Sequence, residues 1–128
     1  MVHYGAHTMG AADGGAGLLG LGWSIRHGDL RIPHFFGLHG IQMIPLLYWL
    51  VIRKWSSAQT GLVAVTAASY FTFVAILAIQ ALRGQSIVDP DSLTLAVWAV
   101  WLLLTVAAWL IVRFSGRAKV MSSAVGVI

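Results

Sequence analysis

The stretch from Leu93 to Val112 reads LTLAVWAVWLLLTVAAWLIV, and it decides the fold because it holds no charged residue. At a rise of 1.5 Å per residue, about 20 helical residues cross roughly 30 Å of hydrocarbon. Two further stretches of similar length, about residues 33–52 and 61–82, also contain no charge. The sequence therefore predicts an all-α integral membrane protein, with three transmembrane helices in an antiparallel bundle.

The overall composition favours lipid as the solvent. Of the 128 residues, 59% are hydrophobic and 9% are charged, and the mean hydropathy is +0.83. The net charge is +4, but the basic residues lie singly or in pairs at the ends of the apolar stretches. That arrangement is typical of membrane-flanking charges and not of a nucleic-acid-binding surface. The chain has no cysteine, which excludes disulfides and thiolate metal sites.

The chain is expected to have three parts and one orientation. Residues 1–31 form a Gly- and His-rich extracytoplasmic segment, residues 32–113 the transmembrane region, and residues 114–128 a cytoplasmic tail. One side of the membrane then holds all the acids, whereas the other holds basic residues only, namely Arg53, Lys54, Arg113, Arg117 and Lys119. By the positive-inside rule we expect a multi-pass protein of the bacterial inner membrane, with its N-terminus outside and its C-terminus in the cytoplasm.

Two of the predicted helices carry features that bear on packing. Pro45 falls in the middle of the helix over 33–52 and should loosen or kink it. In the helix over 61–82, small residues recur every fourth position at Ala64, Ala68 and Thr72. This spacing lets helix backbones approach closely, so we expect that face to pack against a neighbour.

All five histidines lie in the first 39 residues, near the outer membrane surface under this topology. Imidazoles gathered there could hold heme b or a transition metal, or could relay protons. We therefore take His34, His39 and Gln42 as candidate cofactor-binding residues, and His7, His27, His34 and His39 as candidate metal ligands.

Spacing limits these hypotheses. His34 and His39 are separated by about 140° around one helix, whereas His39 and Gln42 share a face. A second heme ligand would have to come from the N-terminal segment or from another subunit, because the other two helices lack histidine. The alternative is that these polar side chains form hydrogen bonds inside the bundle and hold no ligand.

The residues around the membrane edge have structural and functional interpretations as well. Asp29 is expected to cap the first helix or to pair with Arg31 or Arg26, with a role in orienting His27 or His34 as the alternative. Gly37 and Gly40 favour close helix packing over room for a planar cofactor. The Gly-rich stretch 10–22 lacks a phosphate-binding motif and is expected to be a flexible or tightly turning loop.

The first third of the chain carries a distinctive pattern. It contains Gly22-Trp23-Ser24, then Gly28-Asp29-Leu30-Arg31, then His34-Phe35-Phe36-Gly37-Leu38-His39, Gln42 and Pro45, and upstream of these His7-Thr8-Met9-Gly10 and Asp13-Gly14-Gly15. This pattern resembles a motif of uncharacterised bacterial multi-span membrane proteins, for which no activity is established. The resemblance implies that longer relatives have further spans before this region and that this chain is a shortened version.

The leading hypothesis is a non-enzymatic or accessory membrane protein whose helix over 33–52 presents His34, His39 and Gln42 to the bundle interior, where a heme or a metal could be held together with His27 or His7. One alternative is a structural or assembly subunit of a larger membrane complex, or a homo-oligomer, with no ligand. A second is a small transporter or proton-conducting element, although no predicted span contains a charged residue. No set of catalytic residues is evident, so enzymatic activity stays an open question.

Overall fold

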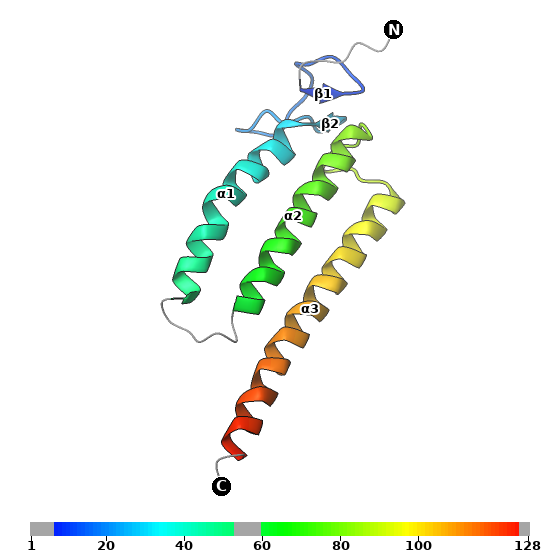
Figure 1. Cartoon of the computed structure of the whole chain (residues 1–128). Coiled ribbons are helices and arrows are strands. Elements are labelled where there is room, and N and C mark those ends of the chain that lie inside the picture. The colour runs from blue at the N-terminus through cyan, green and yellow to red at the C-terminus, as the bar shows by residue number, and fades with distance from the viewer. Residues whose placement is uncertain (1–6, 53–59, 126–128) are drawn as a thin grey trace.

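The structure is a computed structural model that describes residues 7–52 and 60–125, with the backbone alone for residues 51–52 and 116–125. It contains three helices, α1 (Arg31–Ile52), α2 (Thr60–Leu82) and α3 (Ser92–Val125). Two short strands, β1 (Thr8–Met9) and β2 (Gly28–Asp29), precede them. α2 lies between α1 and α3 and packs against both, so the helices form a row (Figure 1). The prediction of an all-helical chain with three helices is confirmed.

Two of the helices, α2 and α3, are long and apolar enough to cross a membrane. In the most apolar stretch of α3 no residue is buried, and Leu103 and Ile111 are 70% and 65% exposed. A helix that is apolar all round and exposed suits a lipid environment. Within the part of the chain whose side chains the structure describes, α1 is not among these helices. Histidines, a glutamine and two prolines lie among its apolar residues.

The helix ends differ from the predicted ends at one place. α1 and α2 begin and end within two residues of the predicted bounds, but α3 continues past Val112 to Val125. The predicted end at Val112 was placed directly before Arg113, the first charged residue after the apolar stretch. Charged residues have good helix propensity, so they end a hydrophobic span without ending the helix. α1 also continues through Pro45.

Glycine allows α1 and α2 to pack closely. Gly40 is buried, and a Cβ atom added there would collide with the ring of Tyr70 on α2. The Tyr70 hydroxyl donates a hydrogen bond to the carbonyl oxygen of Phe36 at 2.5 Å. One turn earlier, a Cβ on Gly37 would lie 3.8 Å from Val74, an ordinary contact. The interpretation as a packing residue is confirmed for Gly40, whereas the space beside Gly37 would admit a Cβ atom.

The small-residue face of α2 does not make such a contact within the described chain. Ala64, Ala68 and Thr72 are all exposed, so the expectation that this face packs against a neighbour is wrong for the chain alone. The larger side chains of α2 make the contact to α1, where the ring of Phe73 meets Phe36 edge-on at 5.3 Å. A repeat of small residues marks a face that a second helix can approach closely. It does not show whether such a partner helix is present.

A small cap covers one end of the helices, and the C-terminal part of α3 extends beyond the other end (Figure 1). β1 and β2 pair antiparallel, with Thr8 opposite Asp29 and Met9 opposite Gly28. Between them the chain turns tightly, through positive φ angles at Gly10, Gly14, Gly20 and Gly22. Only glycine adopts these angles without strain. The expectation of a tightly turning loop is confirmed, whereas the two strands were not predicted.

Candidate functional site

The cap is built around the carboxylate of Asp29, whose side chain is fully buried. It accepts hydrogen bonds from the backbone N–H groups of Ser24 at 2.9 Å and Arg31 at 3.0 Å, and from the Arg31 guanidinium. Burial raises the pKa of Asp29, but the hydrogen bonds from Arg31 and Ser24 outweigh it and hold the pKa below its ordinary value of 3.8. The expected roles in capping α1 and in pairing with Arg31 are both confirmed.

The alternative role of Asp29 is not supported. Among the described residues, its carboxylate makes no hydrogen bond to His27 or His34. Its acceptor positions are occupied by groups that hold the cap on the start of α1. Asp29 is therefore a structural residue of the site, and it does not orient an imidazole.

The cap also rests on the far end of α2. A Cβ atom on Gly28 would collide with the carbonyl oxygen of Ala81, so β2 lies directly against the last turn of α2. The hydroxyl of the buried Ser86 donates to the carbonyl oxygen of Ser24 at 3.4 Å. The buried Gln80 amide donates in turn to the Ser86 carbonyl oxygen at 2.8 Å. These contacts fix the cap relative to the helices.

A polar pocket of about 300 Å³ lies inside the cap. Its wall combines small residues of the Gly-rich loop with seven polar side chains, those of His7, Thr8, Asp13, Ser24, Arg26, His27 and Arg31. This volume is at the small end of the range for ligand sites, and convergent polar side chains are typical of such sites. The structure thus brings together His7 and His27, two of the predicted metal ligands.

Several groups in this pocket have no partner among the described residues. The Arg26 guanidinium and the imidazoles of His7 and His27 make no hydrogen bond or ion pair with other described residues. The wall contains one carboxylate among the described residues, that of Asp13, and it already accepts from the backbone N–H groups of His7 and Thr8. The free groups of the pocket are therefore mainly hydrogen-bond donors.

The other predicted site residues lie elsewhere. His34, His39 and Gln42 are exposed on α1, so the prediction that they point into the interior of this chain is wrong. His39 Nδ1 lies 2.9 Å from the carbonyl oxygen of Phe35 in its own helix, and its ring lies against the Phe35 ring. The face of α1 that packs on α2 contains glycines and Phe36 instead, because close packing there excludes larger polar groups.

These positions do not assemble a metal site within the chain. The described residues contain no group of three or more His, Cys, Asp or Glu side chains placed to hold a metal ion. His3 lies outside the described residues. The heme and metal hypotheses therefore stay predictions.

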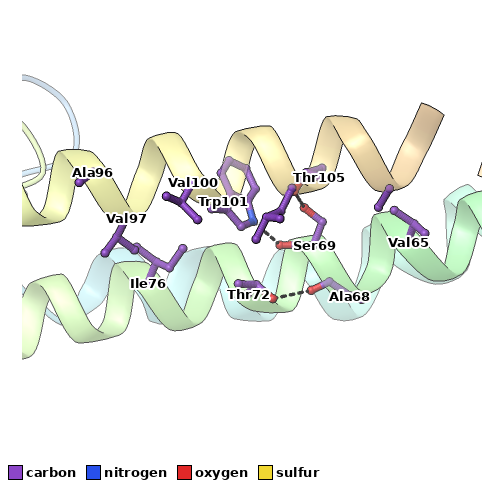
Figure 2. A pocket seen from close by; sticks show the side chains of 12 residues that line it. Val65, Ala68, Ser69, Thr72, Ile76, Ala96, Val97, Val100, Trp101 and Thr105 are labelled. Atoms are coloured by element: carbon purple, nitrogen blue, oxygen red, sulfur yellow. Dashed lines mark hydrogen bonds between the residues drawn. The ribbon is translucent and has the colours of Figure 1, made fainter. Parts of the chain in front are cut away.

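A second hollow, an apolar groove of about 590 Å³, lies between α2 and α3 (Figure 2). The Ser69 and Thr105 hydroxyls are hydrogen-bonded to each other at 2.7 Å, and Trp101 Nε1 donates to the Ser69 carbonyl oxygen. The Thr72 hydroxyl donates to the carbonyl oxygen of Ala68. The hydroxyl groups of the groove therefore already have hydrogen-bond partners within the chain. The groove is apolar and lacks the free polar groups of the cap pocket.

Comparisons with protein-family models, with curated proteins and with solved structures find no match for this chain. The resemblance to a family of multi-span membrane proteins therefore stays a prediction. The cap pocket contains Arg26 and Thr8, two residues that sequence reasoning did not select as site residues. Thr8 belongs to the pattern His7-Thr8-Met9-Gly10, which assigned it no role, and Arg26 belongs to no recognisable motif. Only the tertiary structure places both in the wall of one pocket.

Proposed function

We propose that this chain is a non-enzymatic subunit of the bacterial inner membrane, which crosses the bilayer three times and assembles with a second copy of itself through α1. The cap would lie outside and the end of α3 in the cytoplasm. One observation carries the proposal: the polar side chains of α1 lie on its exposed surface, away from the helices of the same chain.

The depth of α1 follows from its packing on α2. α1 has 22 residues, which at 1.5 Å per residue gives about 33 Å, enough to cross the hydrocarbon core. Its contacts run alongside α2, which is apolar enough to cross by itself. Leu38, Ile41 and Met43 are 51–70% exposed on α1, as suits side chains that face lipid or another membrane helix.

Polar side chains at this depth are costly unless they meet another polar group. Gln42 lies about 16 Å along the helix from Arg31, close to the middle of a bilayer core. It is exposed, and its amide makes no hydrogen bond with other described residues. Around the helix it lies about 200° from Gly40, and therefore opposite α2. Polar groups in membrane helices almost always face protein, so this side of α1 needs a partner.

The chemistry of the glutamine amide favours a second copy as that partner. An amide carries two N–H donors and a carbonyl acceptor, so two Gln42 side chains can satisfy each other across a twofold axis. A hydrogen bond of this kind contributes roughly 0.6–2 kcal/mol in membranes. His39 lies on the same side and adds a further donor or acceptor.

Cross-linking tests the assembly directly, because the natural chain has no cysteine and every introduced thiol is therefore unique. Leu38→Cys places a thiol on the proposed interface, and we expect oxidation in native membranes to give a disulfide-linked dimer. Leu103→Cys is the matched control, since Leu103 is 70% exposed on α3 and outside this interface. It should remain monomeric under the same conditions.

A second variant addresses the role of the amide. Gln42→Leu keeps a similar volume but removes the hydrogen bonds, so it should lower the yield of the Leu38→Cys dimer by about three- to tenfold. A Leu38→Cys chain that stays monomeric in membranes, or a dimer yield that Gln42→Leu leaves unchanged, would contradict the proposal. An absorption spectrum of the same purified dimer would also show whether a heme is present.

A further inference from the structure

The side chain of Thr8 is the first sign of a ligand in the cap. Thr8 is 5% exposed and lines the polar pocket, yet its hydroxyl has no hydrogen-bond partner among the described residues. A buried hydroxyl without a partner costs roughly 1–3 kcal/mol. Native proteins rarely leave such a group unpaired, so the unpaired hydroxyl of a buried residue that lines a pocket points to a bound molecule there.

The wall of the pocket contains two cations, Arg26 and Arg31, and one carboxylate among the described residues, that of Asp13. Arg31 is neutralised by the buried carboxylate of Asp29 at 2.6 Å, and Asp13 accepts backbone N–H groups. Arg26 is exposed and makes no ion pair with other described residues, so its guanidinium is available to an incoming group. Guanidinium N–H groups bind the oxygens of phosphates and carboxylates in pairs, with charge-assisted hydrogen bonds.

The donors approach the pocket from different parts of the chain. Thr8 comes from β1, Arg26 and His27 from the segment before β2, and His7 from the residue before β1. A planar carboxylate accepts hydrogen bonds mainly in one plane, whereas a phosphate offers oxygens in several directions. Gly14 and Gly15 in the wall leave space for the group. The arrangement therefore suits a tetrahedral oxyanion.

The place of the pocket suggests two sources for that group. The pocket is lined by residues of the cap, and the cap lies at the start of α1 (Figure 1), which would be the membrane surface under the proposed topology. The neighbouring turn exposes Leu19 and Leu21, which are 102% and 53% exposed. Exposed leucines on a loop at this level suit contact with the interfacial region of lipids. A phospholipid headgroup and a free phosphate could thus both reach the pocket.

We propose that the cap pocket binds a phosphate group, held by Arg26, Thr8 and the imidazoles of His7 and His27. The site is complete within one chain, so it does not depend on pairing through α1. Its loss would leave the proposed dimer intact, and the loss of the dimer would leave this site intact.

Two titrations distinguish the sources. The full chain, purified in a non-ionic detergent without phosphate, is titrated with inorganic phosphate while the amide resonances of the cap are followed by NMR. In parallel, the chain is titrated with mixed micelles that contain phosphatidylglycerol. Saturable shifts at Thr8 and Arg26 with inorganic phosphate support a free-phosphate site, and shifts with the lipid alone support a headgroup site. No saturable shift in either titration would overturn the proposal.

Variants assign the binding to the pocket. Arg26→Gln should weaken binding about tenfold or more, because it removes a charge-assisted contact. Arg113→Gln makes the same change at the other end of the chain and should leave binding unchanged. Thr8→Val replaces the hydroxyl with a methyl group of the same shape and should weaken binding severalfold.

The pattern of amide exchange in β1 and β2 shows whether each variant keeps the cap folded. If Arg26→Gln opens the cap, the Thr8→Val result decides. Binding that is as strong in both variants as in the natural chain would overturn the assignment.

Discussion

The guanidinium of Arg31 lies against the buried carboxylate of Asp29, with Nη2 2.6 Å from Oδ2 and Nε 3.0 Å from Oδ1. The same Nη2 donates to the carbonyl oxygen of Gly22 at 2.7 Å. Two residues that lie two positions apart in the sequence thus join three parts of the cap: the loop, β2 and the first residue of α1. The wall of the polar pocket depends on this arrangement, because Gly22, Ser24 and Arg31 all line it.

Removing the Asp29 carboxylate should open the cap. Asp29→Ala leaves the N–H groups of Ser24 and Arg31 without their acceptor, which should lower the free energy of cap opening by roughly 2–4 kcal/mol. Hydrogen exchange of the Ser24 amide measures this opening. Asp89→Ala removes an exposed carboxylate that has no ion pair or hydrogen bond with other described residues, and should leave the rate unchanged. Equal protection in both variants would contradict the role of Asp29.

The first turn of α3 should be sensitive to acid only at very low pH. The Thr94 backbone N–H donates to Asp91 Oδ1 at 2.7 Å, and this bond together with contacts from Thr94, Gln85 and Arg83 lowers the pKa of Asp91 from 3.8 to about 2. Because the folded pKa is depressed, the stabilising contribution is complete above pH 3.8 and is lost as the pH falls through about 2.

A carboxyl titration of Asp91 by NMR tests this expectation. In Arg83→Gln the midpoint should rise only slightly, because the Thr94 N–H, the largest cause of the shift, remains in place. A midpoint near 3.8 in the natural chain would show that the capping hydrogen bond is absent.

Two neighbouring glycines of α1 should respond in opposite ways to alanine. Gly40→Ala places a Cβ against the Tyr70 ring, which must move and weaken its bond to the Phe36 carbonyl, so we expect a loss of about 1–3 kcal/mol. Gly37→Ala meets Val74 at an ordinary distance and should be neutral or up to about 1 kcal/mol stabilising, through helix propensity. Unfolding in mixed micelles of rising denaturing-detergent fraction compares the two. Equal stability would show that α1 and α2 are less closely packed at Gly40.

The contact between β2 and α2 can be tested in the same way. Gly28→Ala would force its Cβ into the backbone carbonyl of Ala81, which cannot rotate away, so the cap should detach from the end of α2. We expect faster amide exchange throughout β2 and faster proteolysis of the loop over 10–22. Gly15→Ala is the control, since its Cβ would meet nothing within 4 Å. Unchanged exchange in Gly28→Ala would mean that the cap does not rest on Ala81.

The sequence by itself determined the helices, because an uncharged apolar stretch of about 20 residues has few other stable states. It also indicated Asp29 as a cap, since that role depends on short-range geometry at the start of one helix, and Gly40 as a packing residue, since small residues permit close approach of a second helix. The end of α3 was not predicted correctly, because the charges after Val112 limit the apolar span but not the helix.

Only the tertiary structure decided which side of each helix is covered. Helical periodicity places His39 and Gln42 on one face of α1, but a periodicity cannot say that Gly40 and not Gln42 faces α2. The cap pocket is even harder to predict from the sequence, since Thr8 and Arg26 are brought together by two strands of two residues each. Strands that short leave no pattern in a sequence, because their pairing is stabilised by a buried carboxylate and by tight glycine turns and not by a run of apolar residues.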